Sequence, residues 1–227
     1  MSLKNKKILI TAGPTWVALD DVRVISNTAS GQTGVMLAEL LRKAGARVTL
    51  CLGPGAAAVK DKSVRVLSFR FFDELKKILA SELIKKDYDA VIHSAAVSDF
   101  QPARCAKGKL VSSRGLTVKL APTPKLIGMI KKLHPDAVLI GFKYEPHASP
   151  TVIIKEGRQL MLKSDCDLVV ANTRDKDGYR AFLVSRQGLV PEIRSKKELT
   201  GLLKMYLQAI PDGKTAASCS CGCCGKK

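Results

Sequence analysis

Small and polar residues gather at the start of a predicted helix near residue 33. The run Ser30-Gly31-Gln32-Thr33-Gly34 precedes an apolar repeat of helical spacing. Glycines at such a place let backbone amides approach a phosphate, which the positive end of the helix dipole stabilises. A plain helix N-cap packed closely on a sheet is the alternative reading of the same residues. Asn27 stands just upstream, and Arg23, four residues before it, carries the charge to neutralise an anion.

A second group of candidate residues lies between positions 99 and 109. Lys107-Gly108-Lys109 opens a predicted hairpin that is close in sequence to Asp99. A lysine on a glycine-flanked flap can follow a phosphate or a developing negative charge while the flap excludes water, whereas most loop lysines are simply solvated. Asp99 has a carboxylate suited to Mg²⁺ or to a polar ligand group, or to capping a loop.

Several common catalytic patterns are absent from the sequence. It has no Ser–His–Asp spacing, no HExxH helix and no Walker A run. His93, His134 and His147 are too dispersed to indicate a metal site, so no resident metal is expected. The crowded thiols from Cys219 to Cys224 have the chemistry to bind Zn²⁺ or Cu⁺, but their CxCxCC spacing lacks the paired CxxC units of a structural zinc site.

Apolar runs rich in β-formers alternate with amphipathic stretches along most of the chain. This alternation predicts an α/β fold that is Rossmann-like, with a doubly wound, mostly parallel sheet and helices on both faces. The expected strands cover residues 7–11, 47–52, 64–68, 89–93, 136–141 and 167–171. The expected helices cover residues 33–43, 71–86, 124–133 and 150–163, and a last helix opens with a capping box between Ser195 and Glu198.

Two hairpins interrupt the alternation. The first pairs residues 109–111 with 116–120 and forms a flap, and the second pairs residues 181–185 with 189–194. Small and polar residues follow the strands at 11–15, 94–99, 141–142 and 171–172, which predicts a ligand crevice at the carboxyl edge of the sheet. The second strand ends without a carboxylate and the glycines do not follow the first strand directly, so the dinucleotide fingerprint of an NAD(P)-linked oxidoreductase is missing.

The composition of the 227 residues is that of a folded protein, with 46% hydrophobic and 26% charged residues. The formal net charge of +18 favours polyanionic partners. A basic nucleic-acid-binding module is one alternative, but the few aromatic residues are not interleaved with the basic ones, and no specific nucleic acid is expected. No segment indicates an export signal or a membrane span, so we expect a cytoplasmic protein with one domain over residues 1–211 and a flexible tail over 212–227.

The ordered motifs closely resemble the prokaryotic phosphopantothenate–cysteine ligases. The likeness covers roughly residues 6–205 and rests on residues 8–15, 20–34, 95–100, 141–145 and 167–172, together with Lys109. It implies coenzyme A biosynthesis, in which CTP with Mg²⁺ activates 4′-phosphopantothenate as an acyl-cytidylate and cysteine then displaces CMP. It further implies a free-standing ligase without a fused decarboxylase, a homodimer in which the second hairpin contacts the partner, and a possible separate decarboxylase.

The resemblance also assigns roles to individual residues. Asn27 and Lys109 would be catalytic, with Asn27 holding the acyl-cytidylate and Lys109 reaching the phosphates, and Arg23, Asn27 and Ala96 would seat the substrate. The implied nucleotide-binding residues are Gly13, Ser30, Gly31, Gly34, His93, Ser94, Ala95, Asp99, Lys109, Pro124, Lys125, Leu126, Ile127, Phe142 and Lys163.

Overall fold

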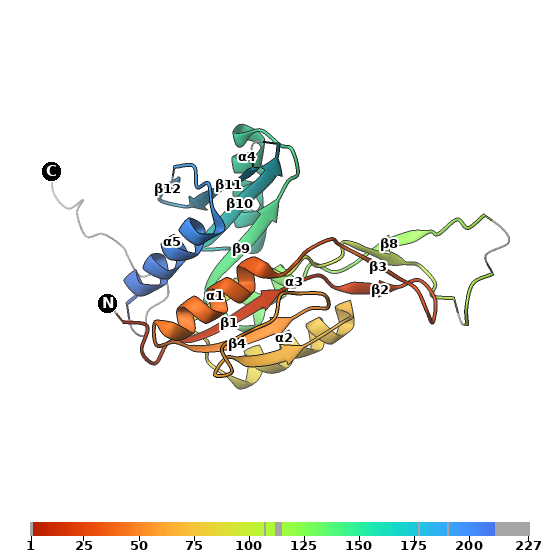
Figure 1. Cartoon of the computed structure of the whole chain (residues 1–227), viewed down its shortest axis with the longest axis horizontal. Coiled ribbons are helices and arrows are strands. Elements are labelled where there is room, and N and C mark those ends of the chain that lie inside the picture. The colour runs from red at the N-terminus through yellow and green to blue at the C-terminus, as the bar shows by residue number, and fades with distance from the viewer. Residues whose placement is uncertain (1, 107, 112–114, 177, 190, 212–227) are drawn as a thin grey trace.

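A computed structural model describes residues 2–106, 108–111, 115–176, 178–189 and 191–211 (Figure 1). The predicted tail at 212–227, including the cysteines from Cys219 to Cys224, lies outside these residues. Within the described ranges, every helix is too short or too polar to cross a bilayer.

A single eight-stranded sheet forms the centre of the molecule. Its strands are β1 (Lys7–Ala12), β4 (Arg47–Leu52), β5 (Arg65–Ser68), β6 (Ala90–His93), β9 (Val138–Tyr144), β10 (Leu168–Asp175), β11 (Gly178–Ser185) and β12 (Gly188–Leu189). They are arranged in the order β12-β11-β10-β9-β6-β1-β4-β5. All pairs from β5 to β10 are parallel, and β11 and β12 are antiparallel. The predicted mostly parallel sheet is therefore confirmed.

Helices cover both faces of this sheet, as the alternation predicts (Figure 1). The helices α1 (Gln32–Lys43) and α5 (Lys196–Ala209) share one hydrophobic core with one face of β1. On the other face, the second core lies under α2 (Phe72–Lys85), α3 (Leu126–Leu133) and α4 (Pro150–Ser164). Gly45 ends the turn after α1 with a φ of 98°, a conformation that glycine adopts without steric cost.

Two details at helix starts differ from the sequence predictions. The helix α3 begins at Leu126 rather than at residue 124, because Pro124 and the N-cap residue Lys125 precede it in extended conformation. The capping box of α5 is half formed. The Ser195 hydroxyl accepts from the Glu198 amide at 3.1 Å, but the Glu198 carboxylate accepts from the amide of Arg194 instead of that of Ser195.

Two short antiparallel pairs form an arm that projects from the sheet (Figure 1). One pair joins β2 (Trp16–Ala18) to β3 (Val24–Ser26), and the other joins β7 (Phe100–Pro102) to β8 (Leu120–Pro122). We call the described residues of 16–26 and 100–122 the arm. The β2–β3 pair was not predicted, and the flap strands expected at 109–111 and 116–120 are wrong. The pairing occurs closer to the sheet, in segments whose proline content hides the strand pattern.

The second predicted hairpin extends the main sheet instead of leaving it. The strand β11 pairs with β10 along eight residues and with β12 on its other side. Ile193 then returns to Ala181 through two backbone hydrogen bonds of 2.9 Å. This segment is therefore the antiparallel edge of the sheet, and the expectation that it contacts a partner stays a prediction.

Candidate functional site

The sheet order places a topological switch point at the carboxyl ends of β1 and β6. From β1 the parallel strands run outward through β4 and β5 on one side and through β6, β9 and β10 on the other. Doubly wound sheets bind ligands at such a switch point, and we call this region the crevice. The predicted residues Gly13, Ser94, Ala95 and Ala96 all lie in the two loops after β1 and β6.

Hydrogen bonds join the two loops to each other. The Ser94 hydroxyl donates to the carbonyl of Thr11 at 2.6 Å, and the Ala95 amide donates to the Thr11 hydroxyl at 3.2 Å. Further along, the Ala96 amide donates to the carbonyl of Gly13 at 2.9 Å, and the Thr15 amide donates to that of Ala96 at 3.2 Å. The crevice floor is thus a rigid, mostly backbone surface formed by the predicted residues.

His93 contributes no charge to this floor. Its side chain is buried, and Nδ1 lies 2.9 Å from the Thr11 hydroxyl. Burial lowers the pKa of His93 to about 4, so the imidazole is neutral at pH 7. The prediction that His93 borders the site through its backbone agrees with this inward-facing ring.

The N-terminus of α1 opens into the same crevice. Gly31 is the N-cap residue with a φ of 62°, no side chain caps the helix, and its first turn has no acidic residue. A methyl group at Gly34 would lie only 2.4 Å from the Cβ of Ala12, so the helix packs directly on the end of β1. A methyl group at Gly31 would lie 3.1 Å from the backbone nitrogen of Gly13. This close packing holds the first amides of α1 beside the β1 loop, and one of them, that of Gln32, donates to the Ser30 hydroxyl at 3.5 Å. Amides at a helix N-terminus have the charge and direction to bind an anion.

Asn27 reaches the crevice from the segment that leads into α1. Its amide nitrogen Nδ2 donates to the carbonyl of Ala96 at 3.1 Å, while the side chain remains exposed to solvent. Ser30, three residues later, is also exposed, and its carbonyl accepts from the amide of Ala57 at 3.0 Å. The structure therefore joins Asn27 to Ala96, whereas Ser30 contacts the loop after β4.

The segment after β8 borders the crevice on the side of the arm. The ammonium group of Lys125 lies 2.5 Å from Asp99, and both side chains are more than half exposed. The hydroxyl of Thr123 holds this segment by donating to the carbonyl of Ser98 at 2.6 Å. Asp99, Pro124 and Lys125 are thus available to a ligand.

The side chains of Leu126 and Ile127, two of the implied nucleotide-binding residues, point into the core. Both side chains are buried in the core under α2, α3 and α4, because they occupy the inner face of the first turn of α3. Only their backbone groups remain to face a ligand.

The ends of β9 and β10 complete the crevice beyond β6. Phe142 packs toward the core under α1, and the Lys143 ammonium lies 2.7 Å from Glu145. Asn172 lies inside β10, at the last residue of its pairing with β9, and its side-chain oxygen Oδ1 is buried with no hydrogen-bond partner among the described residues. No role was predicted for Asn172, although it follows the buried apolar run of β10 in the sequence.

Lys163 does not lie at this crevice. It stands in the last turn of α4, and the chain then turns so that the amide of Asp167 bonds to Leu139 near the start of β9. Because α4 runs against the direction of β9 and β10, its last turn lies at the opposite edge of the sheet. The predicted contact between Lys163 and the nucleotide is thus wrong within a single chain.

Arg23 and Lys109 lie together on the arm. The Arg23 guanidinium donates to the carbonyl of Leu110 at 2.8 Å, and the buried carboxylate of Asp20 accepts from the amide of Leu110 at 3.0 Å. Hydrogen bonds from the backbone amide of Leu110, and then from those of Val22 and Arg23, lower the pKa of Asp20 despite its burial. These contacts hold the segment that carries the exposed Lys109 against the turn between β2 and β3.

The predicted site is therefore divided into two groups of residues. Asn27 lies at the crevice, but the four residues from Arg23 to Asn27 span about 13 Å of extended chain. Asn27 therefore contacts the β6 loop, whereas Arg23 contacts the segment that carries Lys109.

Metal-binding side chains are sparse in the described part of the chain. No group of three or more His, Cys, Asp or Glu side chains there is arranged to hold a metal ion. An ion that arrives with a phosphate ligand needs only one or two carboxylates. Asp99 is a carboxylate available at the crevice.

Comparison with known proteins agrees with this architecture. The chain is 38% identical over 172 residues to the coenzyme A biosynthesis bifunctional protein CoaBC of Thermococcus kodakarensis, a match that covers 76% of this chain and 42% of that protein. The chain thus spans less than half of that relative. The crystal structure of the DNA/pantothenate metabolism flavoprotein from Streptococcus pneumoniae superposes with a TM-score of 0.82 at 27% identity, covering 90% of this chain and 99% of that one.

A second solved structure identifies the corresponding part of the longer relatives. The C-terminal domain of CoaBC matches with a TM-score of 0.73 at 25% identity, covering 91% of this chain and 97% of that domain. The family model described as the DNA/pantothenate metabolism flavoprotein C-terminal domain matches residues 3–200. With this match over most of its length, and with the sheet order and crevice described above, the chain belongs to the DNA/pantothenate metabolism flavoprotein C-terminal domain family.

Proposed function

We propose that the protein is a ligase that joins 4′-phosphopantothenate to cysteine through an acyl-cytidylate, a step of coenzyme A biosynthesis. The observation that carries the proposal is the uncapped N-terminus of α1, held by Gly34 against β1 at the switch point of the sheet. A polyphosphate matches the dipole and the free amides of this helix end. The resemblance to phosphopantothenate–cysteine ligases supplies the identity of the substrates.

The reaction has two steps. A carboxylate oxygen of 4′-phosphopantothenate attacks the α-phosphorus of CTP, a bond forms between that oxygen and the phosphorus, and the bond from the α-phosphorus to the bridging oxygen breaks, so that pyrophosphate leaves. The amine of cysteine then attacks the acyl carbon, CMP leaves, and the amine loses a proton as the amide forms. The enzyme accelerates both steps mainly by holding the reactants together and by stabilising charge, which needs no protein nucleophile.

The residues of the crevice take distinct parts in these steps. The amides near Ser30, Gly31 and Gly34 would bind the triphosphate, and the backbone of the β6 loop would border the nucleotide. The Asn27 carboxamide, which already lies 3.1 Å from the Ala96 carbonyl, would orient the acyl group. The buried, unpaired oxygen of Asn172 would accept a hydrogen bond from the ligand or from bound water.

Magnesium would arrive with the nucleotide in this proposal. Asp99 is the crevice carboxylate best placed to contact it, once the exposed ion pair with Lys125 opens. The ion would neutralise part of the charge on the triphosphate. The choice of CTP over ATP rests on the resemblance to the prokaryotic members of the ligase family.

A homodimer would bring the two groups of site residues together. Half of the large hydrophobic side chains that are exposed in the described ranges lie on the arm: Val22, Val24, Ile25, Phe100, Val111, Leu116 and Leu120. An apolar surface of this kind is typical of a contact with another protein. A second copy bound through the arm would set Arg23 and Lys109 over the crevice of its neighbour. The arm is therefore a better candidate for this contact than the segment 181–194. The expected separate decarboxylase rests on the resemblance alone.

The proposal is tested by incubating the purified protein with Mg²⁺, 4′-phosphopantothenate and cysteine, with CTP or ATP added in turn. Pyrophosphate release that depends on all components, with faster turnover for CTP, is expected. Absence of release with both nucleotides would refute the ligase. Equal rates with CTP and ATP would refute only the cytidine preference.

A further inference from the structure

One positively charged side chain at the first turn of α1, that of Lys196, has no role in the mechanism above. Lys196 is the first residue of α5, and its ammonium donates to the carboxamide oxygen of Gln32 at 2.7 Å. Gln32 is the first residue of α1. The side chain of Lys196 therefore bridges the N-terminal turns of two helices that pack on the same face of the sheet.

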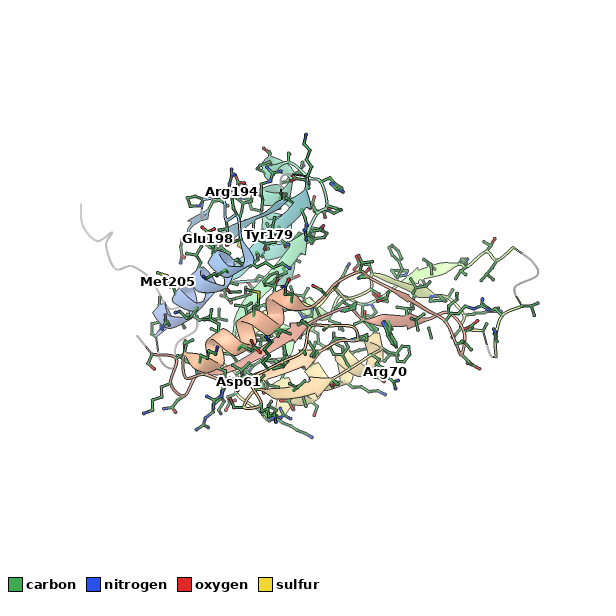
Figure 2. All side chains as sticks on the ribbon, in the orientation of Figure 1. Asp61, Arg70, Tyr179, Arg194, Glu198 and Met205 are labelled. Atoms are coloured by element: carbon green, nitrogen blue, oxygen red, sulfur yellow. The ribbon has the colours of Figure 1, made fainter. Side chains whose placement is uncertain are left out.

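Arg174 lies next to Lys196 because of the strand pairing at the sheet edge. It is opposite Tyr179 in the β10–β11 ladder. The chain returns to β11 where Ile193 bonds to Ala181, so the residues that follow run toward Tyr179. Figure 2 labels Tyr179 and Arg194 in the region where the sheet edge meets α5. Burial, and then the positive charge of Arg174, lower the pKa of Lys196.

The neighbouring carboxylates are engaged elsewhere. Asp175 pairs with Arg180, and Glu192 lies 3.6 Å from the guanidinium of Arg194. Glu198 accepts from the backbone amide of Arg194. Within the described ranges, neither Lys196 nor Arg174 forms an ion pair, and the first turn of α1 adds no acidic residue. Two like charges beside the positive end of a helix repel each other, and a multivalent anion would relieve that repulsion.

We propose that Lys196 and Arg174 form a phosphate-binding pair that extends the anion site at the start of α1. The proposal rests on the proposed function, which brings a phosphate ester and a triphosphate to this crevice. Gln32 holds the Lys196 ammonium in place and exchanges it for a phosphate oxygen when the ligand binds. The uncapped amides of α1 bind the same polyphosphate from its other side. The favoured ligand is the pyrophosphate portion of the nucleotide, which the reaction releases.

The test compares Lys196→Ala and Arg174→Ala with Lys197→Ala. Lys197 is the exposed neighbour in the same helical turn, so its removal changes the net charge equally. Binding of inorganic pyrophosphate is measured by calorimetry, and KM values are measured separately for CTP and for 4′-phosphopantothenate. Loss of one charged hydrogen bond is expected to weaken pyrophosphate binding by about tenfold or more in each test variant. Less than a twofold change is expected in Lys197→Ala, and Lys196→Arg should retain binding.

The two substrate arms identify which phosphate the pair holds. An increase in the KM for CTP alone supports the triphosphate, whereas an increase for 4′-phosphopantothenate alone assigns the pair to the phosphate of that substrate. Equal pyrophosphate binding and equal KM values in Lys196→Ala, Arg174→Ala and Lys197→Ala would overturn the inference. A wild-type protein that binds pyrophosphate through this pair but forms no amide would refute the proposed ligase and leave the phosphate-binding pair standing.

Discussion

The substitution Gly34→Ala tests whether the contact between α1 and β1 positions the phosphate-binding amides. The new Cβ would lie 2.4 Å from the Cβ of Ala12 and 3.0 Å from the hydroxyl oxygen of Ser94. Ordinary contact between such atoms begins at 3.4 Å, so one of the two elements must move by about 1 Å. Because Ala12 belongs to a central strand that is paired on both sides, the helix is the element that shifts.

The expected effect on stability combines two opposing contributions. Overpacking of a core contact costs about 1–3 kcal/mol, and replacing glycine by alanine inside a helix returns about 1 kcal/mol. We therefore expect a net loss of up to about 2 kcal/mol in the free energy of unfolding. The effect on activity is larger, since a displacement of about 1 Å in a binding group can lower the rate about 100-fold.

The matched control is Gly201→Ala. Gly201 also lies inside a helix, α5, and a Cβ there would meet no atom within 4 Å. This variant should gain about 0.5–1 kcal/mol and keep its activity. Urea unfolding and pyrophosphate release are measured on both proteins. If Gly34→Ala proves as stable and as active as Gly201→Ala, the close packing does not position the anion site and the reasoning is wrong.

Three further perturbations have expected outcomes. Lys109→Ala should lower turnover by about 100-fold because the ammonium that stabilises the phosphate charge is lost. Its melting temperature should not change, because the side chain is exposed. The pyrophosphate assay measures the rate and calorimetry measures the melting temperature, and an unchanged rate would remove Lys109 from the mechanism. Asn27→Ala should form the amide slowly, because Asn27 is assigned to hold the acyl-cytidylate. Chromatography of quenched reactions measures the amide formed, and a normal amount would show that this assignment is wrong. Burial would raise the pKa of Glu82, but hydrogen bonds from Arg65, Tyr88 and Lys86 outweigh it and hold the value at about 2. The charged form therefore stabilises the fold above about pH 4.5, and this contribution is lost as the pH falls toward 2. Urea titrations of Glu82→Gln should lack this acid-dependent loss of stability, and a pH dependence equal to that of the wild type would contradict the reasoning.

The alternation of apolar patterns was enough to predict the layers of the molecule. In α1, the buried residues Val35, Leu37, Ala38 and Leu41 recur at helical spacing, and the strand at Arg47–Leu52 was predicted with its observed bounds. Burial of one face dictates such periodicities, so they can be read from a local stretch of sequence. The crevice at the exits of β1 and β6 follows from the same pattern, because parallel strands end at a common edge.

The separation of Arg23 and Lys109 from Asn27 was decided by tertiary structure alone. The strands β2, β3, β7 and β8 are each only three residues long, and the side chains of all but β2 are largely exposed, so they are too short and too open to give a recognisable alternating pattern. The two short pairs lie against each other through contacts between residues about 80 positions apart. Long-range contacts of this kind have no local signature.

Local sequence therefore determined which residues form the sheet and the helices, because each of these buries a regular face. Three features depended on how the elements pack. They are the position of Lys163 at the far edge of the sheet, the burial of Leu126 and Ile127, and the hydrogen bond between Lys196 and Gln32 across 164 residues. Packing depends on the complementarity of surfaces that are distant in the chain. Only the three-dimensional structure brings those surfaces together.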